Sequence, residues 1–299
     1  MMETLKECPV CGASEHKELL QSRDFTVSSE TFGIQECLRC GFAYTNPRPS
    51  LQELGRYYAS EAYISHSDTQ KGLKNRLYHL ARAFTLRRKI SQINRLSGSK
   101  TGRLLDLGCG TGYFLEAAVK AGWQGEGVEP DAGAAQQAAA RSGCNVYPES
   151  QLDEYPEGRF DLITMWHVME HVPDPKQRAA QLYRLLKPGG ILVVAVPNRQ
   201  SLDAEIYGSF WAAWDVPRHL NHFRPADVDR LFSTSGFIKK GMRGMPLDSF
   251  YISLLSEQYR GKGAIGFISA FFNGLRSNLR AMRSDAGLWS SMEYYYQKP

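Results

Sequence analysis

The twelve residues RLLDLGCGTGYF, from Arg103 to Phe114, limit the fold of this chain more than any other stretch. They predict a buried strand, a glycine-rich turn and the start of a helix. Gly108, Gly110 and Gly112 would let the backbone approach a ligand at the carboxyl end of the strand. A second apolar stretch ends in Glu129, where a carboxylate is well placed to accept hydrogen bonds from ribose hydroxyls. Taken alone, this pattern also fits a dinucleotide site.

The residue types in these motifs are more specific than the spacing of the glycines and the acid. DLGCGTG followed by GVEP resembles the class I S-adenosylmethionine (SAM)-dependent methyltransferases. GRFDLITMWHVMEHVPDP looks like their fourth strand and following loop, and LYRLLKPGGILVVAVPN looks like the next helix, turn and fifth strand. The resemblance covers about Arg103 to Phe237.

This resemblance implies an α/β fold, a doubly wound, Rossmann-like sheet of seven mostly parallel strands. FIKKGMRGM and SSMEYYYQ would be its sixth strand and its antiparallel seventh strand. We expect a helical insert at about residues 250–289, which covers the active-site end or forms a homodimer contact. The alternative is a role at a membrane surface, which the short, Gly-interrupted stretch AIGFISAFF favours less than packing in the core or at an interface. The methyltransferase domain would span residues 101–299.

The resemblance also implies roles for individual residues in binding SAM. Asp106 and the turn from Gly108 to Gly112 would meet the amino-acid end of SAM. Glu129 would hold the ribose, and His167 would line the cofactor side of the pocket. Glu149 and Ser150 are the candidates for a place beside the adenine.

Two CxxCG turns in the first 48 residues predict a zinc ribbon. A cytosolic chain with six cysteines favours metal binding or free thiols over disulfides. Four cysteines in pairs complete a tetrahedral sulfur shell and leave no position open for water, which is typical of structural zinc. Such a ribbon binds nucleic acid, docks to its own enzyme domain or shapes a substrate pocket. The ligands would be Cys8, Cys11, Cys37 and Cys40.

Residues 49–100 predict a basic helical connector. From Lys71 to Arg103 there are ten Lys or Arg residues and no acid, with leucines at helical spacing. This is either a solvated face over a packed apolar stripe or a surface for an anionic partner, which would be a phosphorylated sugar, a lipid headgroup or a nucleic acid. Tyr57, Tyr58 and Tyr63 precede it and either pack in the core or cover a bound ligand.

Two loops at the carboxyl ends of the expected fourth and fifth strands carry the candidate catalytic residues. The first contains His167, Glu170 and His171; the second, FWAAWDVPRHLNHFRP, contains Arg218 and His219. Together with the cysteine pairs, these loops resemble the sugar C-methyltransferases. The resemblance implies His219 as general base, assisted by His171. Arg218 departs from the family, which commonly has an acid at this position, and an arginine here suggests binding of a substrate phosphate or carboxylate instead. The alternative is that H-x-x-E-H and a later histidine bind a divalent cation.

We therefore predict methyl transfer from SAM to a small or carrier-linked acceptor, such as a sugar or another polar metabolite. The alternatives are an RNA or protein methyltransferase that recruits its polymer through the ribbon and the basic segment, and a non-catalytic SAM-binding scaffold. An apolar content of 42% and the lack of a long apolar stretch or a signal sequence favour a cytoplasmic protein without a transmembrane segment.

Overall fold

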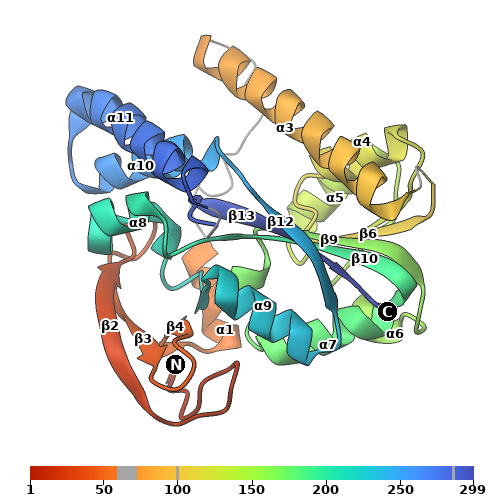
Figure 1. The fold of residues 1–299 in the computed structure, drawn as a ribbon, viewed down its shortest axis with the longest axis horizontal. Coiled ribbons are helices and arrows are strands. Elements are labelled where there is room, and N and C mark those ends of the chain that lie inside the picture. Colours follow the sequence, from red (N-terminus) through yellow and green to blue (C-terminus); the bar gives the residue numbers. More distant parts are fainter. Residues whose placement is uncertain (59–72, 99–100, 285–286) are drawn as a thin grey trace.

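The computed structural model describes residues 1–58, 73–98, 101–284 and 287–299 (Figure 1). Its centre is a seven-stranded sheet with the order β12-β13-β10-β9-β6-β7-β8. The strands are β6 (Arg103–Leu107), β7 (Gln124–Val128), β8 (Val146–Tyr147), β9 (Phe160–Trp166), β10 (Leu186–Pro197), β12 (Ile238–Gly244) and β13 (Ser291–Gln297). The predicted doubly wound sheet is confirmed.

Only β13 runs against its neighbours in this sheet. It pairs antiparallel with β10 and β12, whereas the pairs from β10 to β8 are parallel. The chain leaves β6 toward β7 and β8, then returns to β9 on the other side of β6. Because strand order reverses between β6 and β9, a crevice for a ligand is expected at the carboxyl ends of these two strands.

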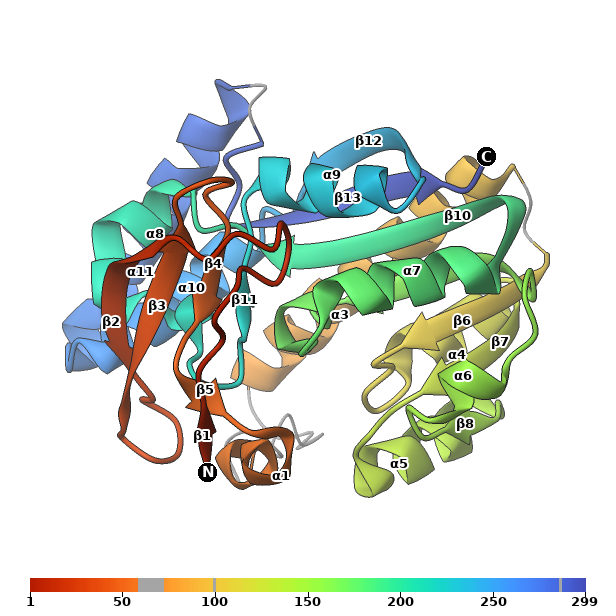
Figure 2. The same ribbon diagram turned by 90° about the horizontal axis from the view of Figure 1, so that it is seen from below.

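Alternating side chains bury the two faces of the sheet in separate clusters. Leu104, Leu162 and Val193 pack on one face with α3 (Leu73–Ser97) and α4 (Tyr113–Lys120). Leu105, Ile163 and Val194 pack on the other with α7 (Pro175–Leu185) and α9 (Pro225–Thr234), which both lie on the near side of the sheet in Figure 2. The remaining helices of this region are α5 (Ala132–Ser142) and α6 (Gln151–Glu154).

The N-terminal segment forms a four-stranded antiparallel sheet with the order β11-β4-β3-β2. Three strands come from the N-terminus: β2 (His16–Arg23), β3 (Thr31–Cys37) and β4 (Ala43–Thr45). The fourth, β11 (Asn221–His222), begins two residues after His219 and pairs with β4. A loop of the methyltransferase domain is therefore part of the N-terminal sheet. Short elements complete this region: β1 (Met2–Glu3), β5 (Arg48–Pro49), α1 (Leu51–Leu54) and η1 (Gly55–Tyr58).

The predicted insert between the last two strands is a pair of helices, α10 (Asp248–Tyr259) and α11 (Gly263–Met282). They pack against each other and against α8 (Leu202–Tyr207), on the left of Figure 1. Among the described residues, no helix is both long and apolar enough to cross a membrane. Tyr63 and the first residues of the basic segment, Lys71 and Gly72, lie outside the described residues.

Candidate active site

The glycine-rich turn after β6 adopts a conformation that suits glycine alone. Gly108, Gly110 and Gly112 have φ values of 70°, 53° and 82°. A Cβ atom on Gly108 would lie 2.4 Å from Cγ2 of Val168, and one on Gly112 would lie 2.6 Å from Cα of Ala138. A Cβ on Gly110 would meet nothing within 4 Å. Gly108 and Gly112 are therefore needed for packing, and Gly110 faces open space that a ligand can fill.

Two carboxylates flank this turn. Glu129 accepts hydrogen bonds through its two carboxylate oxygens from the backbone N–H groups of Gly110 (2.8 Å) and Asp131 (3.1 Å). Burial raises its pKa despite these bonds. Asp106 is buried and accepts a hydrogen bond of 2.7 Å from the Thr164 hydroxyl. Burial raises the pKa of Asp106 to about 7, although Lys89 opposes the rise. A cationic ligand would favour the ionised forms of both acids.

His167 follows β9 and lies between two acids. Its Nδ1 atom lies 3.3 Å from Oε1 of Glu170, and its Nε2 atom lies 3.3 Å from Oδ2 of Asp248. Burial disfavours the charged imidazole, but the hydrogen bonds to Asp248 and Glu170 outweigh it and raise the pKa of His167 to about 10. His167 is therefore a cation at neutral pH and makes a poor general base. Asp248, the first residue of α10, was not anticipated; the only sequence signal is an acid shortly after the sixth strand.

The structure brings His171 and His219 together from two loops. Their ring centroids are 4.6 Å apart and the rings meet edge to face. The Nδ1 atom of His219 lies 2.9 Å from the carbonyl oxygen of Ala213, so this nitrogen carries the proton in the neutral ring. The Nε2 atom is then the basic one. Burial and the nearby His219 lower the pKa of His171 to about 4, so His171 is neutral at pH 7.

Glu170 is the charged member of this histidine cluster. Its side chain is 1% exposed, and its Oε2 atom has no hydrogen-bond partner among the described residues. Burial disfavours the carboxylate, but His167 outweighs it and holds the pKa of Glu170 below its usual value. Glu170, His171 and His219 each offer an atom within 4.8 Å of the others, which is compact enough for a shared proton or a cation.

Arg218 makes its ion pairs and hydrogen bonds within the protein. It is fully buried and pairs with Asp24 at 2.9 Å and with Asp215 at 2.6 Å. It also donates a hydrogen bond to the carbonyl of Tyr57. These contacts satisfy the guanidinium inside the protein, so the suggestion that Arg218 binds a substrate phosphate was wrong.

Tyr58 reaches the histidine cluster from the N-terminal segment. Its hydroxyl lies 3.0 Å from Nδ1 of His171. Tyr57, in contrast, is buried and donates a hydrogen bond to Glu30. Glu149 lies away from this cluster and pairs with Arg178, and Ser150 is exposed. The adenine contacts proposed for these two residues stay a prediction.

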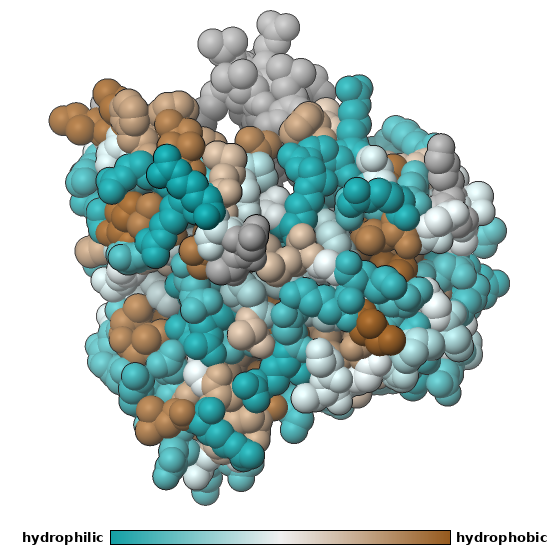
Figure 3. Space-filling view, in the orientation of Figure 1, coloured by the Kyte–Doolittle hydropathy of each residue, from teal (hydrophilic) through white to brown (hydrophobic). Residues whose placement is uncertain are grey.

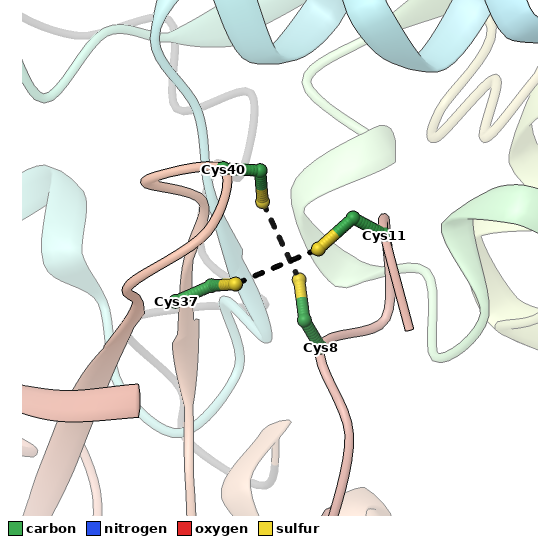
Figure 4. A group of neighbouring side chains, drawn as sticks. All are labelled: Cys8, Cys11, Cys37 and Cys40. Carbon is green, nitrogen blue, oxygen red and sulfur yellow. Dashed lines mark hydrogen bonds between the residues drawn. The ribbon is translucent and has the colours of Figure 1, made fainter. Parts of the chain in front are cut away.

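The four cysteines of the two CxxCG turns meet at one point (Figure 4). The Sγ atoms of Cys8 and Cys40 are 3.7 Å apart, and those of Cys11 and Cys37 are 3.5 Å apart. A tetrahedral site with Zn–S bonds of about 2.3 Å places its sulfurs about 3.8 Å apart. The donor set and its spacing therefore fit a closed four-sulfur metal site.

Comparison with known proteins agrees with this geometry. A family described as methyltransferase domain matches residues 79–238, which is more than half of the chain. A ubiquinone biosynthesis O-methyltransferase from Methylococcus capsulatus is 34% identical over 165 residues, covering 50% of this chain and 68% of the relative. One from Bordetella avium is 31% identical over 180 residues, covering 54% and 75%.

Solved structures share the fold at lower identity. A SAM-dependent methyltransferase from Archaeoglobus fulgidus superposes with a TM-score of 0.51 at 20% identity, covering 73% of this chain and 94% of that one. Another from Thermotoga maritima gives 0.51 at 19% identity, covering 76% and 95%. The fold and the glycine turn thus define a SAM-dependent methyltransferase. The chain belongs to the methyltransferase-domain family.

Proposed function

We propose that this enzyme methylates a small or carrier-linked polar acceptor, with His219 as the general base. The observation that carries the proposal is the bond between Nδ1 of His219 and the carbonyl of Ala213. This hydrogen bond fixes the tautomer of His219 and leaves its Nε2 atom as the basic one. His219 lies beside the loop after β9, and Val168 of that loop packs against Gly108 of the glycine turn. An imidazole whose orientation is fixed in this way, at this edge of the sheet, is suited to remove a proton during methyl transfer.

SAM supplies an activated methyl group, and the residues of this chain bind it, align the acceptor and take the proton. Asp106, Glu129 and the glycine turn would hold the cofactor. His219 would accept the proton from the attacking hydroxyl or acidic carbon. The carboxylate of Glu170 would then stabilise the imidazolium that forms, while neutral His171 packs against its ring.

An oxygen acceptor is supported by the relatives, whose names describe O-methyltransferases of ubiquinone biosynthesis. A small acceptor is supported by the described part of the basic segment. Arg82 stacks on Tyr113 at 3.6 Å, and the amine of Lys89 lies 3.7 Å from the centre of the Trp166 ring. Both cations make cation–π contacts with aromatic residues of the methyltransferase domain, so they do not contribute to an exposed basic surface that could bind RNA. A sugar is our first candidate within this class.

We also propose that the four-cysteine cluster binds one structural zinc ion. The cluster lies at one end of the sheet whose last strand, β11, directly follows the His219 region. Arg224, just after β11, donates a hydrogen bond to the carbonyl of Cys40. Zinc would therefore stiffen the loop that carries the base, through contacts that do not involve the acceptor.

The experiment that tests the proposal measures transfer of a radiolabelled methyl group from SAM to panels of nucleotide sugars, phenols and RNA. We expect a product in a small-molecule panel. Transfer to RNA alone would replace the proposal with the polymer alternative, and SAM binding without transfer to any acceptor would favour a scaffold.

A divalent cation at Glu170, His171 and His219 is the second candidate mechanism, favoured by the 4.8 Å spacing of their ligand atoms. Treatment with a chelator distinguishes the cation mechanism from the general-base mechanism. With His219 as base, EDTA leaves initial turnover unchanged while zinc remains bound to the cysteines. Turnover that is lost at once and restored by Mg²⁺ or Mn²⁺ would establish the cation mechanism.

A further inference from the structure

Helix α11 turns its large apolar side chains outward, the reverse of a helix that packs on a core. The residues of its buried face are small or polar: Gly266, Ala270, Gly274, Ser277, Asn278 and Ala281. Its exposed face carries Ile265, Phe267, Ile268, Phe271, Phe272, Leu275, Leu279 and Met282, with exposed fractions from 36% to 78%. In Figure 3, hydrophobic side chains gather at the upper left, where α10 and α11 lie in Figure 1.

Close packing between α10 and α11 explains the small residues. A Cβ atom on Gly274 would lie 2.8 Å from a ring carbon of Phe250 and 3.1 Å from its Cα atom. The ring of Phe250 also stacks on Phe271, with centroids 5.6 Å apart. The packing therefore needs glycine on the inner side of α11 and gives Phe271 one partner, but it does not account for the other exposed apolar side chains of the outer face. The outer face needs a separate explanation.

All charged residues of α11 are cationic. The helix and the residue after it contain Arg276, Arg280 and Arg283, and there is no acid from residue 263 to residue 283. All three arginines are exposed, and Arg280 pairs with the exposed Glu205 at 2.7 Å. The N-terminal half of the helix is apolar outside, and the C-terminal half combines apolar residues with this positive charge.

We propose that α11 binds the surface of an anionic membrane, lying in the interface with its apolar face among the lipids. An amphipathic helix with bulky apolar residues on one side and only basic charges beside them is typical of such binding. The arginines complement anionic headgroups, and α11 does not meet the requirements of a membrane-crossing helix. Since α10 begins at Asp248, which contacts His167, the docked helix pair would turn this end of the active site toward the bilayer.

A second copy of the chain fits this face less well. In a symmetric pair the same face contacts itself, so the charges at its border would all be positive. When two helices pair in a coiled coil, only about two of every seven residues of each helix supply the apolar contact. In α11, four of the seven residues from Ile265 to Phe271 are apolar and exposed. The broad apolar face and the unbalanced charge both favour lipid over a partner helix.

Flotation of the full-length protein with vesicles tests this proposal. We expect binding to vesicles of about 30% phosphatidylglycerol in phosphatidylcholine, and much weaker binding to pure phosphatidylcholine. The double variant Ile268→Ser/Phe272→Ser should lower the partition coefficient at least about tenfold, because two buried apolar contacts are lost. Arg276→Glu/Arg283→Glu should abolish the preference for anionic vesicles.

The matched control is Leu51→Ser, which removes an equally exposed apolar side chain from α1 and should leave binding unchanged. Circular dichroism and thermal unfolding check that each variant is folded. No flotation of the wild type with anionic vesicles overturns the proposal. So does a wild-type dimer, seen by sedimentation, that becomes monomeric in Ile268→Ser/Phe272→Ser.

Discussion

The rings of His171 and His219 meet edge to face with centroids 4.6 Å apart, although the two residues lie 48 positions apart in the sequence. The contact joins the loops after β9 and β10. Its geometry is tied to the N-terminal sheet, because β11 pairs with β4 two residues after His219. The candidate catalytic cluster is therefore supported by both the SAM-binding sheet and the cysteine-containing segment.

Replacing His219 with alanine should lower kcat by about 10²- to 10⁴-fold, the usual loss when a general base is removed. The dissociation constant of SAM, measured by calorimetry, should not change. His16→Ala is the control, because His16 is exposed on β2. A variant that retains wild-type kcat would remove His219 from the mechanism.

Glu129→Gln should weaken SAM binding about tenfold, since the carboxylate that we expect to accept hydrogen bonds from the ribose hydroxyls becomes an amide. Glu116→Gln is the matched control on the nearby surface, where Glu116 pairs with Lys120 on α4. Calorimetric titration with SAM measures the dissociation constant of each variant. Equal affinity in the two variants would contradict the ribose assignment.

The free energy of unfolding should fall between about pH 6.5 and pH 10 because of His167. Its pKa is about 10 in the folded protein, so the folded state binds a proton that the unfolded chain releases near pH 6.5. The stabilisation is complete below the unfolded pKa and is lost as pH rises through the folded pKa. Because the imidazole is about one-third exposed, we expect only about 1–2 kcal/mol.

Asp248→Asn should remove much of this dependence, because it takes away the acid with the strongest effect on the pKa of His167. Urea unfolding at several pH values measures the difference between this variant and the wild type. The control is Asp131→Asn, which changes an acid at the N-terminus of α5. Parallel pH profiles for wild type and Asp248→Asn would show that the ion pair contributes nothing.

Elemental analysis should find one zinc ion per chain. Cys8→Ser should lose it and lower Tm by about 5 °C or more, because a closed sulfur site contributes directly to folding. Cys144→Ser should retain zinc, since Cys144 lies outside the four-cysteine cluster. A wild-type protein that is folded and free of metal would refute the zinc proposal.

Loss of zinc should also reduce turnover more than SAM affinity. The cysteine segment is connected to the His219 loop through β4 and β11, whereas the glycine turn lies in the other sheet. Measuring kcat and SAM binding on the same Cys8→Ser preparation tests this difference. A parallel loss of both would indicate general unfolding instead of a local effect.

Local motifs determined much of this protein from the sequence alone. The strand, glycine turn and acid from Arg103 to Glu129 specify the SAM-binding half, because their conformations depend on neighbouring residues and on burial of an apolar strand. The two cysteine pairs and the last two strands are local patterns of the same kind. The seven-stranded sheet was therefore predictable, including the antiparallel last strand.

Only the tertiary structure decided which long-range partners satisfy the buried charges. Arg218 was assigned to a ligand, but Asp24, almost 200 residues earlier in the chain, binds it instead. His167 receives its second acid, Asp248, from the insert, and Tyr58 reaches His171 from the N-terminal segment. Sequence spacing cannot predict such pairs, because they depend on how distant elements pack and on which buried charge lacks a counter-charge nearby.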